Sequence, residues 1–262
     1  MTERWIDLDG AANVRDAGGL PAGDRVVRPD RLIRSDNLQG LTPADVRRLV
    51  DDHHVRAVAD LRTSVEVDLE GPGPLTREPR VTIEHLSLLA EAGEHTDVVA
   101  AEEDGPVLMP WQKREAAERE RPSIVEIYLR YLEERPDSIL AALRLIAYTD
   151  GATVVHCAAG KDRTGVTVAL ALDEVGVDRD AIVADYVATG DRLQPLLDRL
   201  KASPTYASDV RRMPDEQHLP RPESMQGFLA ALDELNGGTS NWLRKHGWTD
   251  DDAAALRRAL LG

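Results

Sequence analysis

Cysteine, aromatic side chains and positive charge are all scarce in this sequence of 262 residues. The single cysteine, at position 157, excludes a disulfide within the chain, so nothing here indicates an oxidising compartment. Aromatic residues make up 4 %, so a core has to be built mainly from aliphatic side chains, which suits an α/β protein. The net charge of -15 argues against a general nucleic-acid binder, because such proteins need a basic face.

Long apolar runs and metal-ligand patterns are also missing. No stretch approaches the length of a membrane span, and residues 1–10 lack the apolar core of a signal peptide. We therefore expect a cytoplasmic protein, with export by a route without a cleavable signal as the alternative. His53 and His54 are adjacent and the other histidines are scattered, so we expect no metal and no cofactor. No Gly/Ser-rich or Pro-rich linker divides residues 1–262, which predicts a single domain.

One segment combines a strand, a loop and a helix around the single cysteine. Residues 152–155 form a short run typical of a buried strand, and residues 166–175 are apolar as in a buried helix. Between them, residues 156–165 read His-Cys-Ala-Ala-Gly-Lys-Asp-Arg-Thr-Gly. In a strand–loop–helix unit, the N–H groups of the loop and of the first helical turn converge on an anion. The residues that we expect to bind it are Ala158, Ala159, Gly160, Lys161, Asp162 and Arg163.

The residue types in this loop suit nucleophilic attack on a phosphate. A thiol at a helix N-terminus beside a cation favours the thiolate form, which makes Cys157 a candidate nucleophile. Arg163 offers a planar fork of donors that matches two phosphate oxygens. Thr164 can donate its hydroxyl to the sulfur. The alternative, an ordinary buried cysteine, gives no reason for the neighbouring Lys161 and Arg163.

The Cys-x5-Arg-Thr pattern that follows His156 resembles the signature loop of the protein tyrosine phosphatase superfamily. Residues 160–165 are similar to the loop of the atypical bacterial phosphatases related to mycobacterial protein tyrosine phosphatase B. Residues 13–19, Asn-Val-Arg-Asp-Ala-Gly-Gly, are similar to a segment near the start of the same family, where Phe and Leu are usual at positions 14 and 17. We expect Arg15 and Asp16 to support the structure, with contact to the phosphate site as the alternative.

The resemblance implies an α/β fold with a central, mostly parallel sheet flanked by helices, like that of protein tyrosine phosphatases. It also implies a C-terminal helical lid at about residues 191–235, with Leu193, Leu196, Leu197 and Leu200 either on its underside or in an ordinary core. The implied activity is hydrolysis of phosphomonoesters through a phosphocysteine, most simply on phosphotyrosine in proteins. Lys161 is similar to a lysine of lipid phosphatases, so dual specificity or phosphoinositide substrates are also implied.

The general acid has to be sought elsewhere than in classical tyrosine phosphatases, because the sequence has no Trp-Pro-Asp tripeptide. Asp162 matches by position the acid proposed for the resembling family, and we place it first. Asp60 comes second, because it ends an expected strand at residues 55–62 and the carboxyl ends of strands gather functional groups. Its alternatives are a pair with Arg62 or a helix cap. His156 is expected to hydrogen-bond the loop rather than to act as a base.

Two other functions compete with phosphatase activity. A rhodanese-like sulfurtransferase also uses a cysteine in a loop after a strand, but such loops usually lack the closing Arg163-Thr164 pair. A binding module that recognises phosphorylated protein or inositol lipid without turnover is the other alternative, although Cys157 and Arg163 are both retained. The partners that we expect are therefore phosphorylated protein or phosphoinositide, with no nucleic acid and no membrane span.

The remaining segments predict the order of elements. Residues 25–34 read as a β-hairpin with a turn at Pro29-Asp30, and residues 81–89 read as a strand. Residues 91–121 are polar and form an expected insertion. Ser123 with Glu126 predicts a capping box that opens a helix. Further helices are expected at residues 42–52, 137–148, 178–189, 191–201, 223–235 and 249–261, whereas residues 203–222 lack a clear period.

Overall fold

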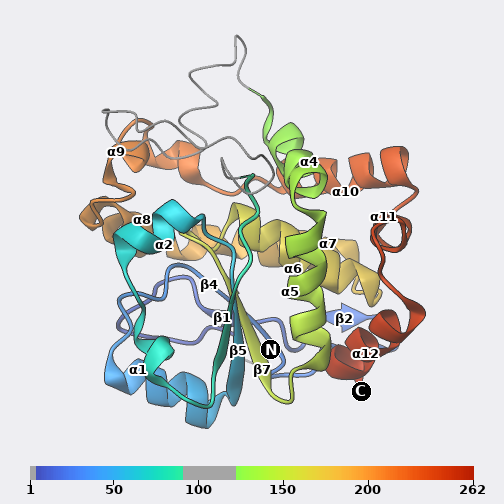
Figure 1. The fold of residues 1–262 in the computed structure, drawn as a ribbon. Helices are drawn as coiled ribbons and strands as arrows, with labels where there is room; N and C mark the ends of the chain where they lie inside the picture. Colours follow the sequence, from blue (N-terminus) through green and yellow to red (C-terminus); the bar gives the residue numbers. More distant parts are fainter. Residues whose placement is uncertain (1–3, 91–121) are drawn as a thin grey trace, which may run out of the picture.

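The computed structural model describes residues 4–90 and 122–262. In this part of the chain, a five-stranded sheet lies between two layers of helices and loops, as Figure 1 shows. Its strands lie in the order β1 (Arg15–Asp16), β4 (Leu32–Ser35), β7 (Ala152–His156), β5 (Val55–Asp60) and β6 (Thr82–His85). Only β1 is antiparallel to its neighbour. The predicted α/β fold with a mostly parallel sheet is therefore confirmed.

The register of the sheet brings the ends of four strands to one edge. Ser35 of β4 and Asp60 of β5 both lie opposite His156 of β7, and Asp60 lies opposite His85 of β6. Because these strands are parallel, the chain leaves each of them on the same side of the sheet. Cys157 follows β7 directly, so the loop that it begins lies at the centre of this edge.

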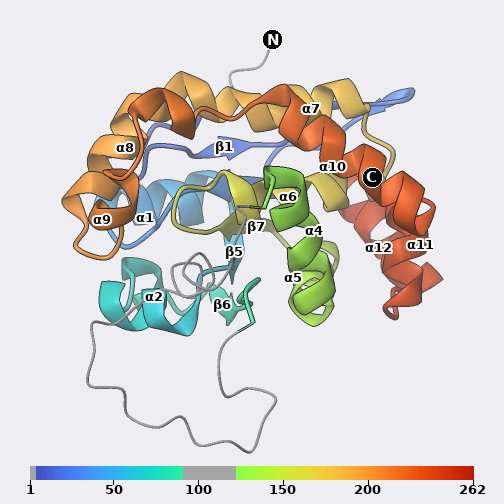
Figure 2. The same cartoon turned by 90° about the horizontal axis from the view of Figure 1, so that it is seen from above.

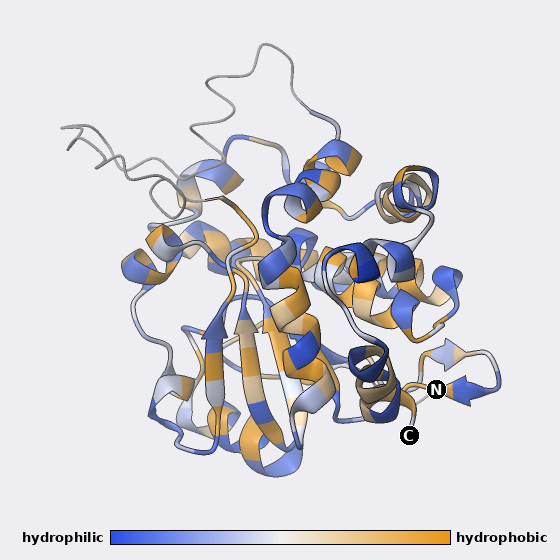
Figure 3. Cartoon of the chain, turned by 45° about the vertical axis from the view of Figure 1, so that its right-hand side comes forward, coloured by the Kyte–Doolittle hydropathy of each residue, from blue (hydrophilic) through white to orange (hydrophobic). Residues whose placement is uncertain are grey.

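Alternate residues of the strands belong to two different cores. Leu32 and Val155 pack into the larger cluster, whereas their chain neighbours Ile33 and Val154 pack into a smaller one on the opposite face. This alternation follows from the period of two of a strand. In Figure 3 the strands are coloured mostly as hydrophobic, whereas the surrounding helices alternate between hydrophobic and hydrophilic residues. A sheet covered on both faces is what parallel strands require.

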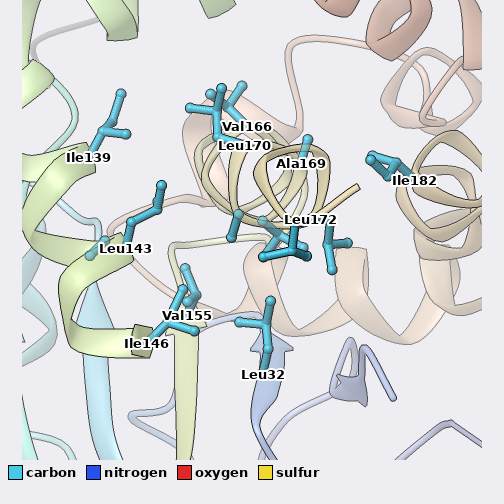
Figure 4. Close-up of a cluster of buried hydrophobic side chains, with 14 of the residues drawn as sticks. Leu32, Ile139, Leu143, Ile146, Val155, Val166, Ala169, Leu170, Leu172 and Ile182 are labelled. Carbon is cyan, nitrogen blue, oxygen red and sulfur yellow. The ribbon is translucent and has the colours of Figure 1, made fainter. Parts of the chain in front are cut away.

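The larger cluster is organised around α6 (Asp162–Glu174). Val166, Val168, Ala169, Leu170 and Leu172 are all 0 or 1 % exposed, so this helix is buried on every side. Figure 4 shows its side chains facing Leu32 and Val155 of the strands and Ile139, Leu143 and Ile146 of α5. The helix that follows the cysteine loop is thus fixed by packing along its whole length. The other helices of this layer are α4 (Ile124–Glu134), α5 (Pro136–Tyr148), α7 (Arg179–Val187), α10 (Pro222–Asn236), α11 (Thr239–Lys245) and α12 (Asp250–Leu261).

The opposite face is covered by shorter elements. Here α1 (Pro43–Arg47) continues into a wider π-helical segment, Arg48–Asp52, and Leu49 and Val50 of that segment are fully buried. Next along the chain, α2 (Ser64–Glu70) follows β5, and a short 3-10 helix spans Pro74–Arg77.

A third cluster lies over the cysteine loop. It is formed by α8 (Leu193–Ala202) and α9 (Ala207–Val210), and it packs against Ala158 and Ala159 of the loop. We call residues 193–218 the covering segment. Figure 2 shows α8 and α9 at the opposite end of the molecule from α11 and α12. Helix α10, which we had included in the predicted lid, instead packs against α4 and α7 and belongs to the main body.

Several local predictions are confirmed. The predicted capping box of Ser123 with Glu126 opens α4. The helices expected from residues 42 and 249 are present, and the structure adds a capping box to each, Thr42 with Asp45 and Thr249 with Asp252. The helices of residues 137–148, 178–189 and 191–201 are present with boundaries shifted by a few residues. Among the described residues, no helix is long and apolar enough to cross a membrane. The expected insertion at residues 91–121 lies outside the described residues.

The predicted hairpin at residues 25–34 is wrong. The hairpin instead joins β2 (Pro21–Ala22) to β3 (Arg25–Val26), and β4 pairs with β7 and β1. The Pro29-Asp30 pair does mark a sharp change of direction, with Asp30 at a φ of 53°. It leads the chain into the sheet rather than back along β3. The expected strand at residues 81–89 is also shorter, because β6 ends at His85.

Candidate active site

The cysteine loop joins the end of β7 to the first turn of α6. Cys157 is 2 % exposed, and α6 begins at Asp162, so its first-turn N–H groups face the loop. Gly160 has a φ of 66°, which glycine adopts without strain. A Cβ at this position would lie 2.4 Å from the carbonyl oxygen of Ser35. The loop can therefore pass this close to β4 only with glycine at position 160.

Three carbonyl groups of the loop are bonded to the surrounding protein. The backbone N–H of Asn37 donates to Ala158 O at 3.0 Å. Asn13 Nδ2 donates to Ala159 O at 2.9 Å, and Arg34 Nη2 donates to Gly160 O at 2.7 Å. In a trans peptide, the C=O of one residue and the N–H of the next point in opposite directions. The N–H groups of residues 159, 160 and 161 are thus turned away from these partners, towards the inside of the loop.

A buried carboxylate holds the arginines beneath the loop. Asp185 of α7 binds Arg34 Nη1 at 2.6 Å and Arg15 Nε at 3.3 Å, and it also pairs with Arg4. Burial alone would raise the pKa of Asp185, but the charges of these arginines hold it well below its usual range. Arg34 in turn binds the loop carbonyl of Gly160. The ion-pair cluster therefore fixes the conformation of the loop from below.

The expected supporting role of Arg15 and Asp16 agrees with these contacts. Arg15 bonds to Asn13 Oδ1 and to the main-chain oxygen of Asp185 at 2.6 Å, and thereby places the amide that binds the loop. Asp16 accepts hydrogen bonds from the N–H groups of Gly18 and Asp30 at 2.8 and 2.7 Å. Neither residue lines the cavity at Cys157. Direct contact with a phosphate, the alternative, has no support in this geometry.

Arg163 is oriented by a residue that the sequence interpretation missed. Glu66 of α2 binds it through both oxygens, at 2.6 Å to Nη1 and 2.9 Å to Nη2. Glu66 is fully buried, which would raise its pKa, but the charge of Arg163 lowers it below its usual value. The same carboxylate closes a capping box with Thr63. The Thr63-x-x-Glu66 spacing was visible in the sequence, but it indicates only the start of a helix.

Asp60 does not have the surroundings of a general acid. Arg62 donates to both of its oxygens, from Nε at 2.9 Å and from Nη2 at 2.6 Å. Burial would raise the pKa of Asp60, but His156 and Arg62 hold it well below its usual range, so the carboxyl carries no proton to give. Asp60 is also absent from the cavity wall. The geometry contradicts the candidate role as an acid and agrees with the alternative, a pair with Arg62.

His156 lies beneath the loop rather than beside the sulfur. Its Nδ1 is 3.3 Å from the carbonyl oxygen of Cys157, and its Nε2 is 3.5 Å from Asp60 Oδ1. Burial lowers the pKa of His156 to about 4, so the imidazole is neutral at pH 7. These contacts agree with the expected hydrogen bond to the loop.

Asp162 and Lys161 both face the cavity at Cys157. Asp162 Oδ1 accepts a hydrogen bond of 2.6 Å from the hydroxyl of Tyr128, and its Oδ2 lies 3.7 Å from Lys161 Nζ. Lys161 Nζ also donates to the main-chain oxygen of His218 at 3.0 Å. The loop lysine is therefore bonded to the covering segment. Thr164 is fully buried, and its hydroxyl has no hydrogen-bond partner within residues 4–90 and 122–262.

A cavity of about 470 Å³ opens above the loop. Its floor contains Cys157, Ala158, Ala159 and Arg163, whereas Gly160 is not exposed to it. One wall belongs to the covering segment and the other to α4. The apolar side chains of these walls are Leu193, Leu196, Leu197, Leu200, Val210 and Met213 on one side and Ile127 and Tyr131 on the other. The predicted leucines thus line the cavity, as the underside of a lid would. They also pack together, as in an ordinary core.

Comparison with known proteins assigns the chain to a family. Residues 6–262 match the model of a family described as the tyrosine phosphatase family. The chain is 31 % identical to the triple specificity protein phosphatase PtpB of Mycobacterium tuberculosis, over 98 % of this chain and 99 % of that protein. It is 30 % identical to a tyrosine-protein phosphatase of Nostoc commune, over 88 % of this chain and 74 % of that protein.

The protein therefore belongs to the tyrosine phosphatase family. Its enzyme class is that of the protein-tyrosine phosphatases, which are hydrolases of phosphoric monoesters. The family membership confirms the resemblance that the cysteine loop and residues 13–19 indicated. It also favours phosphate hydrolysis over sulfur transfer and over binding without turnover.

Proposed function

We propose that this phosphatase acts through a covalent phosphocysteine at Cys157. The observation that carries the proposal is the bidentate pair between Glu66 and Arg163 beside the loop. It presents the guanidinium at the floor of the cavity, next to Cys157 and the inward-facing N–H groups. Preorganised donors of this kind stabilise the charge on the oxygens of a transferring phosphoryl group.

The proposed reaction has two steps. In the first, the Cys157 thiolate forms a bond to phosphorus while the bond to the ester oxygen breaks, and Asp162 gives its proton to the leaving oxygen. In the second, water attacks phosphorus, the sulfur–phosphorus bond breaks, and Asp162 takes a proton from the water. Inorganic phosphate and the thiolate result. The proposed role of Thr164 is to donate its unpartnered hydroxyl to the sulfur as the thiolate re-forms.

Phosphotyrosine in proteins is the substrate that we propose first. The cavity walls above Cys157 are mostly apolar, although Arg130, Asp209 and His218 also line them, and they suit an aromatic ring better than a short aliphatic chain. Phosphoserine, phosphothreonine and phosphoinositides are proposed as further substrates, because the mycobacterial relative is named a triple specificity phosphatase. Lys161 would contribute to a highly charged headgroup only after its bond to His218 O is broken.

A kinetic panel tests both the mechanism and the substrate. We would compare kcat/KM on a phosphotyrosine peptide, a phosphothreonine peptide and a short-chain phosphoinositide, with Cys157→Ser as the blank. Trapping of ³²P on the wild-type chain but not on the blank is expected. Persulfide formation from thiosulfate at Cys157, without phosphate release, would instead establish sulfur transfer.

Asp162→Asn tests the acid. Loss of a general acid costs about 10² to 10⁴ in rate, so we expect at least a hundredfold lower kcat/KM on the phosphotyrosine peptide. Esters with a good leaving group need less protonation and should be affected less. Near-normal turnover of the phosphotyrosine peptide would remove Asp162 from the mechanism.

A further inference from the structure

Two tyrosine hydroxyls lie in series behind Asp162. Tyr128 of α4 donates to Asp162 Oδ1 at 2.6 Å, and the hydroxyls of Tyr128 and Tyr186 of α7 are 2.8 Å apart. Their rings meet edge to face, with centroids 6.4 Å apart. Neither tyrosine belongs to the phosphate-binding loop itself. They connect the side chain of Asp162 to two helices of the main body.

The direction of this chain of hydrogen bonds follows from proton counting. A phenol has one proton to donate. Because the Tyr128 hydroxyl donates its hydrogen bond to Asp162, the hydrogen bond between the two tyrosines has to be donated by Tyr186. The order of donation is therefore Tyr186 to Tyr128 to Asp162. Tyr128 thus occupies Asp162 Oδ1, whereas Oδ2 lies 3.7 Å from Lys161 Nζ, and both Asp162 and Lys161 line the cavity.

Burial keeps both phenols in the donor form. Tyr128 is fully buried and Tyr186 is 2 % exposed. Burial raises the pKa of Tyr128 and of Tyr186 far above the usual value, and the charge of Asp162 raises both further. The two hydroxyls are consequently neutral at every pH at which a phosphatase is assayed. Ring packing of Tyr128 against Tyr131 and Phe228 fixes its position.

We propose that Tyr128 is a positioning residue for the general acid, held in place by Tyr186. The inference rests on the proposed role of Asp162 as the acid. By binding Oδ1, Tyr128 aims Oδ2 at the leaving oxygen of a substrate above Cys157. Classical enzymes bring their acid to the site on a separate Trp-Pro-Asp loop. Here the acid is part of the phosphate-binding loop and is directed by hydroxyls from the helical layer.

The leaving group of the substrate gives this proposal a specific signature. An acid that is held in the wrong orientation slows the hydrolysis of esters whose leaving oxygen has to be protonated. Esters with a good leaving group depend less on the acid and are slowed less. A change that only disturbed the loop or the fold would slow both kinds of ester alike.

The test uses Tyr128→Phe on the full chain, with Tyr148→Phe as the matched control. Tyr148 is exposed, its hydroxyl bonds to Asp252, and neither residue lines the cavity. We expect Tyr128→Phe to lower kcat/KM about tenfold on a phosphotyrosine peptide, in line with the loss of one hydrogen bond to a charged group. On difluoromethylumbelliferyl phosphate, which has a good leaving group, the loss should be about threefold at most. The control should show neither change.

A double variant separates this inference from the proposed function. If Tyr128 acts through Asp162, Tyr128→Phe together with Asp162→Asn should be no slower than Asp162→Asn alone. Additive losses, or equal losses on good and poor leaving groups, would overturn the role of Tyr128. If Asp162→Asn itself showed no dependence on the leaving group, the proposed function of Asp162 would fail instead. Alkylation of Cys157 by iodoacetamide at the wild-type rate would show that the loop of Tyr128→Phe is intact.

Discussion

The single carboxylate of Glu66 takes part in two structures, a helix cap and an ion pair. Its oxygens close the capping box at Thr63, which starts α2, and they hold Arg163 of the cysteine loop. The Glu66 side chain is fully buried and that of Arg163 is 10 % exposed, so the carboxylate has no water to replace its partner. Removal of one member of a buried pair usually costs about 3 to 5 kcal/mol, because the other charge is left uncompensated.

Glu66→Gln is therefore expected to affect stability and catalysis together. Glutamine can still accept the hydrogen bonds of a capping box, but it carries no charge for Arg163. We expect a loss of about 3 kcal/mol in the free energy of unfolding, measured with urea, and at least a tenfold weaker inhibition by inorganic phosphate. Glu126→Gln provides the control, because it alters the similar but exposed capping box of α4. Equal effects of the two substitutions would contradict this account.

His156 gives a second prediction at the residue scale. Its pKa is lowered from 6.5 to about 4 in the folded protein by burial, and it returns to the ordinary value on unfolding. Between these values the unfolded chain binds a proton that the folded protein does not, so stability falls as the pH falls. We expect a loss on the order of 2 kcal/mol between pH 7 and pH 5 in urea titrations. His156→Gln should reduce this slope, and an unchanged slope would assign it to other groups.

At the residue scale, the functional residues of the loop could be predicted from the sequence, but the residues that hydrogen-bond them could not. Cys157, Asp162 and Arg163 lie within seven positions, and the chemistry of each residue type indicates its use. Glu66 is 97 positions from Arg163 in the chain, and Arg34 is 126 positions from Gly160. Pairs at such distances depend on the strand order, which hydrophobic periodicity does not reveal.

At the scale of elements, the covering segment determines access to the cysteine. Leu196, Leu197 and Leu200 of α8 are buried against Tyr206 and Val210, and the same cluster meets the alanines of the loop. Cys157 is only 2 % exposed beneath it. The covering segment therefore forms one wall of the route to the sulfur, and we propose that this part of the predicted lid opens to admit a reagent or a substrate.

The rate of alkylation of Cys157 can measure that opening, because the chain has no other cysteine. A buried Leu→Ala substitution costs about 2 to 5 kcal/mol, and in α8 much of this cost falls on the closed arrangement. We expect Leu197→Ala and Leu200→Ala to speed up alkylation by iodoacetamide about tenfold. Leu256→Ala of α12 removes a similar contact in the main core and should leave the rate unchanged. Equal acceleration by all three would indicate global unfolding instead.

Elements were predicted best where local chemistry decides them. The capping box predicted at Ser123 and the helix starts expected at Thr42 and Thr249 are confirmed, because the bonds involved span three residues. The hairpin at residues 25–34 failed for the opposite reason. Two β-branched runs around a Pro-Asp turn suit a hairpin locally, but β4 gains more by pairing with the fully buried β7. The burial of β4 beside β7 here outweighed the local preference for a hairpin turn.

At the scale of the whole molecule, the net charge of the chain is opposite in sign to the charge of the phosphate site. The chain carries a net charge of -15, whereas the cavity floor presents Arg163 and inward N–H groups to an anion. Long-range repulsion of an anionic substrate is screened by salt, and the short-range attraction inside the cavity is screened much less. Capture of strongly anionic substrates should therefore be slow at low ionic strength.

This effect can be measured with two phosphotyrosine peptides, one flanked by acidic residues and one by neutral residues. Between 20 and 150 mM KCl, we expect kcat/KM to rise about twofold or more for the acidic peptide and to change little for the neutral one. A fall of kcat/KM for the acidic peptide would show that a positive local field dominates its approach.

The strand order has a consequence for the synthesis of this protein. β4 and β5 are separated in the sheet by β7, which the ribosome makes about a hundred residues after them. Until β7 is inserted, the sheet exists only as two unjoined halves with open edges, a state that exposes nascent chains to misassociation. The strand that joins them ends at His156 and continues into Cys157. Completion of the sheet and assembly of the phosphate site are therefore one event, and a chain stalled before it has neither.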